Sequence, residues 1–173
     1  MYPLLATADY LRQEIAGDNV TFINNCNINF TNICTVRCGF CAFGKDADDP
    51  EAYILDDEAI LKKAQGAVDK GAHEFCVMGG VLPDADVEYY EHLLQLLKGE
   101  FPNIMIHGFS PTMIKDASVV SGISVEDAFE RLKSAGLDTL PGTAAEILTD
   151  RSREIICPEK VTTCLLYTSP SPR

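Results

Sequence analysis

The sequence predicts an α/β fold, a partial (β/α) barrel of about four βα units that is truncated before closure. Short apolar runs alternate along the chain with amphipathic segments of helical period, which is the pattern of consecutive βα units around a parallel sheet. The length of 173 residues is below the roughly 250 residues that are typical of a closed eight-stranded barrel. With 46% hydrophobic and 23% charged residues, the chain has the composition of a protein that buries a core.

Four apolar runs are the candidate strands. The first covers residues 20–23 and continues toward Ile28, and the second and third cover residues 75–78 and 104–106. The fourth and weakest run covers residues 137–140. The strands of a parallel sheet are buried on both faces, so continuous apolar runs of this length favour such a sheet.

Four further segments carry apolar residues at helical spacing, and each is bounded by residues that start or stop helices. They follow Asp57, Val87, Pro111 and Ser124 and end near Gly71, Gly99, Ser121 and Gly136. Aspartate, serine and proline are favoured in the first turn of a helix, and glycine is favoured just beyond its end. Each helix therefore has one apolar face to bury against the sheet.

The end of the chain departs from this rhythm. Residues 164–173 read CLLYTSPSPR and show no core-forming pattern. We therefore expect residues 1–163 to be the N-terminal portion of a barrel and residues 164–173 to be a non-homologous or disordered tail.

Charge and apolar patterning exclude several classes of partner. The chain has 14 basic and 26 acidic side chains, a net charge of −12 that repels nucleic acid and anionic lipid. No apolar run approaches the roughly 20 residues of a membrane-spanning helix, and no basic region precedes the first apolar stretch. Seven cysteines is an odd number, which fits reduced thiols better than a disulfide framework. We expect a cytoplasmic protein without a nucleic-acid or membrane partner.

The most informative segment is a loop with three closely spaced cysteines after the first predicted strand. Cys34, Cys38 and Cys41 form a C-x3-C-x2-C array. An iron-sulfur cluster held by four cysteines is closed, whereas three thiolates leave one iron of a 4Fe-4S cluster open for another ligand. Arg37 and Lys45 lie near the array in sequence and would offset part of the negative charge of the cluster.

Two other interpretations of the cysteines stay open. A zinc site normally has a fourth cysteine or histidine ligand at short spacing, and the nearest histidine, His73, lies outside the loop. The three cysteines could also be ordinary buried residues. The spacing favours an iron-sulfur cluster over zinc, and a metal site over buried thiols.

The loop resembles that of the radical S-adenosylmethionine (SAM) superfamily. The three cysteines and the aromatic Phe40, directly before Cys41, match the superfamily motif. The resemblance implies a barrel of radical SAM type and a 4Fe-4S cluster whose open iron binds the amino and carboxylate groups of SAM. It also implies an external electron donor, because an electron from the cluster breaks a carbon-sulfur bond of SAM to give a 5'-deoxyadenosyl radical.

Several further segments resemble the FO synthase second-subunit family, the 4-hydroxyphenyl transferases of deazaflavin coenzyme biosynthesis. They are NINFTNIC, FCAFGK, HGFSP, AGLDTLPGTAAEILTD and REIICPEKVTT. The resemblance implies that the hydroxybenzyl part of L-tyrosine is joined to 5-amino-6-(D-ribitylamino)uracil, and that a partner radical SAM subunit of FO synthase then closes the ring. Because family members continue beyond this chain, we expect this polypeptide alone to be inactive.

Two alternative functions remain open beside this one. The menaquinone-pathway enzymes aminofutalosine synthase and dehypoxanthine futalosine cyclase share the cysteine loop and a segment similar to residues 140–147. A non-enzymatic zinc or iron-sulfur binding module could use the same three cysteines.

The resemblance also assigns cofactor-binding roles. Cys34, Cys38 and Cys41 would ligate the cluster. Phe40, Gly79 and Gly80 would contact SAM, while Thr143 and Glu146 would reach its ribose or amino group. Two of these assignments have a simpler explanation, because Gly79-Gly80 could be a plain turn after a strand and Glu146 could stand at a helix start, where the dipole favours a carboxylate.

Substrate contacts are expected at the end of the third strand. By the same resemblance His107 and Ser110 would face the substrate cavity, and His107 is the candidate catalytic residue. A histidine after an apolar strand can equally be a packed, hydrogen-bonded residue. Thr112 stands where the family has an acidic residue, so the chain departs from the family pattern at this point.

Overall fold

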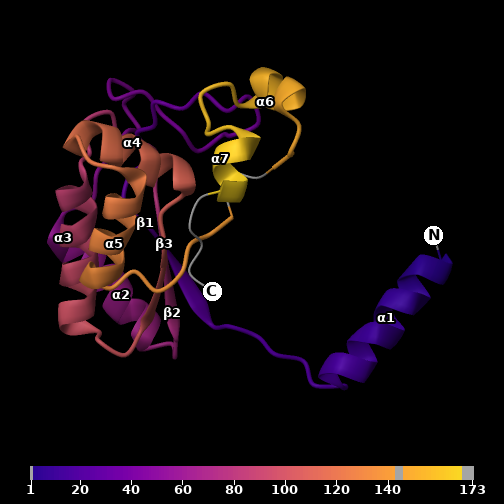
Figure 1. Cartoon of the computed structure of the whole chain (residues 1–173). Coiled ribbons are helices and arrows are strands. Elements are labelled where there is room, and N and C mark those ends of the chain that lie inside the picture. The colour runs from indigo at the N-terminus through magenta and orange to yellow at the C-terminus, as the bar shows by residue number, and fades with distance from the viewer. Residues whose placement is uncertain (1, 143–145, 169–173) are drawn as a thin grey trace.

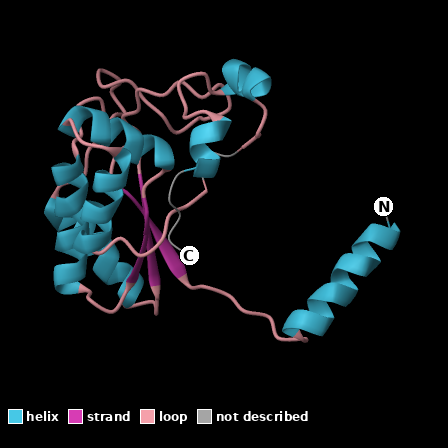
Figure 2. Cartoon of the chain, viewed as in Figure 1, coloured by secondary structure: helices cyan, strands magenta, loops and turns pink. Residues whose placement is uncertain are grey.

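The computed structural model describes residues 2–142 and 146–168 and contains a three-stranded parallel sheet. The strands are β1 (Asn25–Asn29), β2 (Glu74–Met78) and β3 (Met105–Gly108), in the order β1-β2-β3. β1 pairs with β2, and β2 with β3, both in parallel. The helices that connect the strands, and the two helices that directly follow β3, gather on one side of this sheet (Figures 1 and 2). The predicted α/β fold with a parallel, unclosed sheet is confirmed.

The four predicted helices are present as α2 (Asp57–Val68), α3 (Val87–Glu100), α4 (Pro111–Ser121) and α5 (Val125–Ala135). Their starts are capped by side chains. Asp56 accepts a hydrogen bond from the Ala59 N–H, and Ser124 accepts one from the Asp127 N–H. α5 ends at Gly136, which has a φ of 116° that favours glycine. Local capping signals were therefore sufficient to locate these helices.

The first predicted strand begins later than expected. Residues 20–23 are not in a strand, and Val20 and Phe22 are 91% and 87% exposed. They lie in the extended connection that leads into β1 (Figure 1). No described strand or helix covers them, so their apolar character does not produce a strand.

The prediction of a fourth strand at residues 137–140 is wrong. Residues 137–140 approach β3 through a single bridge, between His107 and Thr139. The Asp138 side chain replaces part of a strand ladder, because its Oδ2 accepts a hydrogen bond of 2.7 Å from the Ile106 N–H. The chain therefore leaves the sheet after one pairing.

The core lies between the sheet and the helices and extends to the carboxyl ends of the strands. Ile28, Phe75, Val77 and Ile106 point from the strands into it and are at most 1% exposed. A cluster of aromatic rings continues the core beyond the strand ends: Phe30, Tyr89, Tyr90 and Phe109, with ring centroids 4.6–6.3 Å apart. Aromatic pairs at such separations stabilise the base on which the loops above them rest.

Three helices lie outside the predicted set: α1 (Tyr2–Ala16), α6 (Asp150–Ile156) and α7 (Thr163–Thr168). α1 lies apart from the sheet and has no buried residue (Figure 1). α7 crosses the expected boundary at residue 163, where no regular element was predicted. The division into residues 1–163 and a tail stays a prediction.

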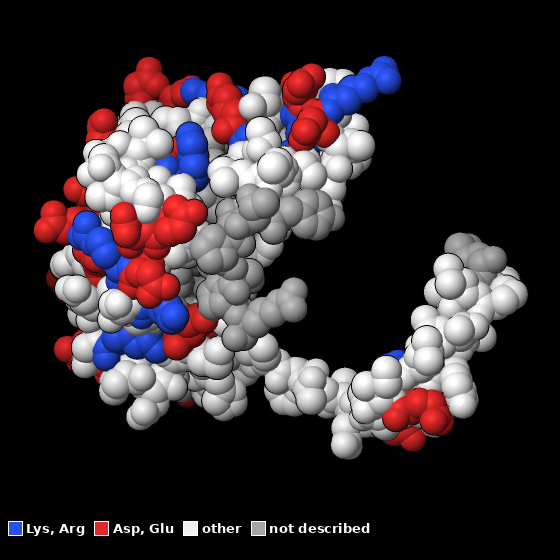
Figure 3. All heavy atoms as spheres, viewed as in Figure 1, with Lys and Arg blue, Asp and Glu red and all other residues white. Residues whose placement is uncertain are grey.

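Among the charged side chains of this chain, acidic ones outnumber basic ones. Acidic side chains are spread over the helical side of the molecule, with basic side chains between them (Figure 3). This distribution agrees with the net charge of −12. Among the described residues, no helix combines the length and the apolar character that crossing a membrane requires.

Candidate functional site

The three cysteines of the predicted cluster loop line one cavity at the carboxyl ends of the strands. This cavity, called the cysteine pocket below, has a volume of about 240 Å³ and is lined by Cys34, Cys38 and Cys41 together with residues of four other segments. The carboxyl end of the strands is where (β/α) barrels carry their active sites. The prediction that this loop builds a site is supported by its position.

Backbone hydrogen bonds tie the cysteine loop to the end of β2. The Cys34 N–H donates to the Lys45 carbonyl at 3.0 Å, which closes the loop on itself. The Thr35 N–H donates to the Val81 carbonyl at 2.9 Å, and the Val81 N–H donates to Cys34 Sγ at 3.3 Å. The loop is thus held by backbone groups and keeps its thiols near the pocket.

Gly79 and Gly80 allow this close approach. A Cβ at Gly80 would overlap the Ile33 carbonyl and lie 2.8 Å from Cys34 Cβ, and a Cβ at Gly79 would lie 2.8 Å from the Phe30 ring. Both glycines line the cysteine pocket. The close approach of the cysteine loop requires glycine at position 80, and the packing of the Phe30 ring requires it at position 79; the predicted contact with SAM stays a prediction.

The chemistry of the donor set fits an iron-sulfur cluster. In the described part of the chain, no three His, Cys, Asp or Glu side chains are placed to hold a single metal ion. A 4Fe-4S cluster is held differently, because each thiolate bonds to a different iron and the donors surround a larger body. Three thiols line one pocket, and their loop packs so closely against Gly80 that no larger residue fits there. The site therefore has the donor chemistry and the support that such a cluster needs.

Burial raises the pKa of the Cys38 thiol above its ordinary value, and the Lys160 ammonium opposes this rise. The Cys41 N–H donates to the Cys38 carbonyl at 3.0 Å, so the chain turns tightly between the two cysteines. In the metal-free loop, Cys38 is therefore mainly a neutral thiol near neutral pH.

The cation near the thiols is not one that the sequence analysis named. Arg37 pairs with Asp46, and Lys45 Nζ lies 2.6 Å from Glu51 Oε2 and 3.5 Å from Asp49 Oδ2. Carboxylates therefore pair with both cations, and neither Arg37 nor Lys45 lines the cysteine pocket, so their effect on the charge of a cluster stays a prediction. Lys160, from the far end of the chain, lines the cysteine pocket instead.

Lys160 connects two predicted cofactor residues. Its ammonium lies 5.5 Å from the centre of the Phe40 ring and forms an ion pair with Glu146. Glu146 also lines the cysteine pocket, but it lies in a bend with a φ of 20°. The alternative that Glu146 stands at a helix start is wrong, because α6 begins at Asp150.

Residues 146–161 fold over the cysteine loop. The Gly39 N–H donates to the Ile156 carbonyl at 2.8 Å, and the Arg37 N–H donates to Glu159 Oε2 at 3.0 Å. Arg153, only 4% exposed, stabilises the segment from within by donating to the Val161 carbonyl at 2.5 Å. The sequence offered one signal for this role, the REIICPEKVTT segment, but spacing alone could not place Arg153 or Lys160 beside the cysteines.

The turn from β3 into α4 brings polar groups to the cysteine pocket. Phe109 is buried and has a φ of 60°, a left-handed conformation that is uncommon for an aromatic residue. Ser110, predicted to face the substrate cavity, and Thr112 both line the cysteine pocket. The Thr112 hydroxyl is buried and has no hydrogen-bond partner among the described residues.

Two predicted site residues, His107 and Thr143, are not among the described residues that line the cysteine pocket. His107 is half-buried on β3, its Nδ1 lies 2.6 Å from Thr139 Oγ1, and it is not among the residues that line the cysteine pocket. This placement fits the alternative of a packed, hydrogen-bonded histidine, and its catalytic role stays a prediction. Thr143 lies outside the described residues.

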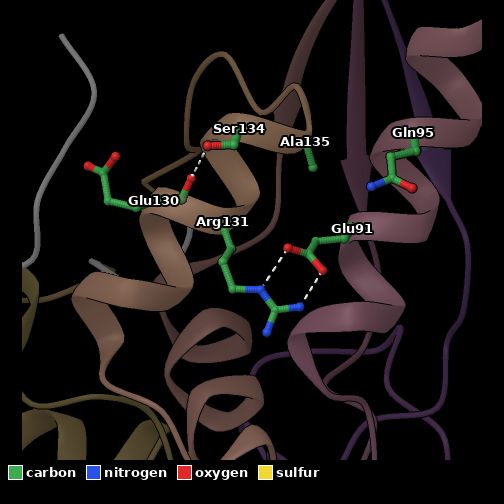
Figure 4. A pocket seen from close by; sticks show the side chains of 6 residues that line it. All are labelled: Glu91, Gln95, Glu130, Arg131, Ser134 and Ala135. Carbon is green, nitrogen blue, oxygen red and sulfur yellow. Dashed lines mark hydrogen bonds and ion pairs between the residues drawn. The ribbon is translucent and has the colours of Figure 1, made fainter.

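A second hollow lies between α3 and α5 (Figure 4) and is lined by Glu91, Gln95, Glu130, Arg131, Ser134 and Ala135. Two of its charged groups, Arg131 and Glu91, bind each other. Arg131 donates two hydrogen bonds to Glu91, at 2.8 and 2.5 Å, and Ser134 Oγ donates to the Glu130 carbonyl at 2.7 Å. We assign these contacts to the packing of the two helices.

The chain matches one protein family model, and it is similar in sequence to known proteins and in fold to solved structures. The family model of the radical SAM superfamily matches residues 28–162. The chain is 48% identical over 160 residues to a 5-amino-6-(D-ribitylamino)uracil--L-tyrosine 4-hydroxyphenyl transferase of Methanothermobacter thermautotrophicus, covering 92% of this chain and 44% of that protein. It is 47% identical over 163 residues to the protein of the same name from Nostoc sp., covering 91% of this chain and 42% of the relative. The chain therefore spans less than half the length of these relatives.

Solved structures with a similar fold include two of the FeFe-hydrogenase maturase HydG. One aligns with a TM-score of 0.66 at 16% identity and covers 88% of this chain and 32% of its own. The other, from Carboxydothermus hydrogenoformans, aligns with a TM-score of 0.53 at 18% identity and covers 79% of this chain and 39% of its own. At this level of identity the likeness concerns the fold.

Proposed function

The chain belongs to the radical SAM superfamily, and from this premise we propose that it forms part of a radical SAM transferase. The reaction would join the hydroxybenzyl part of L-tyrosine to 5-amino-6-(D-ribitylamino)uracil in deazaflavin biosynthesis. The observation that carries this proposal is the 48% identity over 160 residues to a transferase named for these two substrates. The chain covers 44% of that relative, so the activity is proposed for a longer polypeptide that contains it.

The proposed site has a distinct role for each part of the cysteine pocket. Superfamily members use a 4Fe-4S cluster and SAM, which together supply a carbon-centred radical that removes a hydrogen atom from a substrate. Cys34, Cys38 and Cys41 would hold the cluster in this protein. The Lys160 ammonium lines the same pocket and opposes the rise that burial causes in the pKa of Cys38, so it would offset part of the negative charge of the thiolates, although its ion pair with Glu146 already compensates part of its own charge.

Exclusion of water is the second task of the pocket. Its wall includes the apolar side chains of Val36, Phe40, Phe43, Met78 and Val81. Radical chemistry requires a dry, enclosed site, because water and solutes would otherwise compete for the reactive species. We propose that Phe40 and the backbone of Gly79-Gly80 contact SAM from this wall.

The remaining assignments are part of the same proposal. Thr143 and Glu146 would reach the ribose or amino group of SAM, and Ser110 and His107 would contact the substrate. A partner radical SAM subunit and an external electron donor would complete the pathway step. A cytoplasmic location is proposed because the cysteines must stay reduced to hold a cluster.

The test is anaerobic reconstitution of the full-length protein with iron and sulfide, followed by reduction in the presence of SAM. We expect 5'-deoxyadenosine, and with L-tyrosine and 5-amino-6-(D-ribitylamino)uracil a coupled product visible by mass spectrometry. Cys41→Ala should lose both, whereas Cys26→Ala, outside the loop, should retain them.

Three results would reject this proposal in different ways. Absence of SAM cleavage by a fully loaded cluster would exclude a radical SAM enzyme. Turnover of a futalosine-type substrate, with tyrosine and the diaminouracil inert, would favour the menaquinone-pathway alternative. Stoichiometric zinc without iron would favour a non-enzymatic zinc module.

A further inference from the structure

We propose that Thr112, in the first turn of α4, is a ligand-binding residue that holds an amino-acid carboxylate in the cysteine pocket. The inference rests on the proposed function, because SAM and L-tyrosine both carry this group. It does not depend on the predicted roles of His107 or Glu146. Thr112 lines the same pocket as the three cysteines and comes from a different segment of the chain.

The first argument is the buried hydroxyl. Thr112 is 2% exposed, and its Oγ1 has no hydrogen-bond partner among the described residues. A buried hydroxyl without a partner destabilises a fold, whereas a valine of the same shape would avoid this penalty. Retention of a hydroxyl at such a position is explained if a bound ligand supplies the partner.

The second argument is the pattern of backbone donors at the start of α4. Pro111 has no N–H, and the N–H groups of Met113 and Ile114 donate to the hydroxyl and the carbonyl of Ser110, at 3.2 and 3.1 Å. Within the described residues, the N–H of Thr112 has no such acceptor. Thr112 therefore offers two donors, its N–H and its O–H, which suits the two oxygens of a carboxylate.

The electrostatic setting favours an anion at this position. α4 is an 11-residue helix with no acidic residue in its first turn, so the positive end of its dipole is not compensated there. The carboxylate of Glu146 lines the same pocket, but it is paired with Lys160 and lies 4.0 Å from Arg153 Nη1. The repulsion between Glu146 and a bound carboxylate is therefore reduced.

The backbone before α4 sets this geometry. Phe109 holds its φ of 60° because its N–H donates to the Val77 carbonyl at 2.9 Å and its ring packs 4.6 Å from the Tyr90 ring. The turn leads directly from β3 into α4, whose first turn then lines the pocket. Strain of this kind persists where the surrounding structure maintains it, and it is frequent at binding sites.

The test compares Thr112→Val and Thr112→Ser in the full-length, cluster-loaded protein. Affinities for SAM and for L-tyrosine are measured separately by equilibrium dialysis, and thermal stability without ligand is measured by circular dichroism. We expect Thr112→Val to weaken the binding of one ligand by about tenfold, as loss of a hydrogen bond to a charged group does. Thr112→Ser, which keeps the hydroxyl, should bind within about twofold of the unmodified protein.

The stability measurement separates a binding role from a structural one. Thr112→Val should melt at the same or a higher temperature, because it removes a polar atom that has no partner in the unliganded fold. Loss of SAM affinity alone identifies the carboxylate of the cosubstrate, and loss of tyrosine affinity alone identifies that of the substrate. Either result supports the proposal.

Two results would overturn it. If Thr112→Val binds both ligands as the unmodified protein does, the hydroxyl has no role in binding. A lower melting temperature in Thr112→Val would show instead that the hydroxyl serves the fold. If the unmodified loaded protein binds neither SAM nor tyrosine, the proposed function fails first, and this outcome is distinct from the other two.

Discussion

Replacement of Gly80 by alanine should displace the cysteine loop from the end of β2. The added Cβ would overlap the Ile33 carbonyl and lie 2.8 Å from Cys34 Cβ. The Ile33 contact involves backbone atoms, so rotation of a side chain cannot relieve it. The loop must move as a whole, and this movement would disturb the hydrogen bond of 3.0 Å from the Gly80 N–H to the Thr31 carbonyl.

The expected cost follows from this geometry. Overpacking of a well-packed site typically costs about 1–3 kcal/mol, and a clash with backbone belongs at the upper end, about 3 kcal/mol. For a chain of this size, 1 kcal/mol corresponds to roughly 2–4 °C in melting temperature. Gly80→Ala should therefore melt roughly 6–12 °C lower than the unmodified protein.

Gly66→Ala is the matched control. Gly66 lies within α2, and a Cβ there would meet no atom within 4 Å. Alanine favours the helix over glycine by about 1 kcal/mol, so this variant should be slightly more stable. The two substitutions add the same methyl group and should have opposite effects.

The assays are thermal unfolding by circular dichroism and iron content after anaerobic reconstitution. Gly80→Ala should lose stability and bind less iron, while Gly66→Ala should keep its full iron content. If Gly80→Ala has the same melting temperature and the same iron content as the control, the loop does not depend on close packing at Gly80. The inference that Gly80 supports the pocket then fails.

Three further predictions concern buried polar groups. Arg153→Met should lower the free energy of unfolding in urea by about 1–3 kcal/mol, because the carbonyls of Ile147 and Val161 lose a donor; an unchanged midpoint would contradict this. In metal-free protein, the rate of alkylation of Cys38 by iodoacetamide, followed by mass spectrometry, should rise with pH to a midpoint above the ordinary cysteine value of about 8.5, because burial raises its pKa; a midpoint at or below that value would refute it. Burial also raises the pKa of Tyr90, so the unfolded chain releases this proton first and stability should fall as pH rises above about 10. Tyr90→Phe should flatten this fall, and an equal slope in both proteins would exclude Tyr90 as its cause.

Helices were easier to predict from the sequence than strands. The caps and periodicity of α2 to α5 are local, and the structure confirms all four helices. A strand exists only where a neighbouring strand or helix pairs with it or covers it. Residues 20–23 are as apolar as a strand but have no such neighbour among the described residues, and residues 137–140 meet β3 at one bridge only.

Some residues of the candidate site could likewise be identified from the sequence, and others could not. The cysteine loop was identified from spacing, because Cys34, Cys38 and Cys41 are close along the chain. Lys160 and Thr112 were not identified, since each approaches the loop from another segment. The sequence suggested Arg37 and Lys45 as neighbouring cations, but proximity along the chain did not predict that acidic neighbours pair with both.

By itself, the sequence determined that three thiols share one short loop, that glycines stand at the end of the next strand, and that helices follow in the order of a barrel. Covalent spacing and local backbone preference decide these features. Only the tertiary structure decided which polar residues line the pocket with the thiols: Lys160, and Thr112, whose hydroxyl has no partner among the described residues. These contacts join distant segments, so they depend on how the whole core packs, which no local pattern encodes.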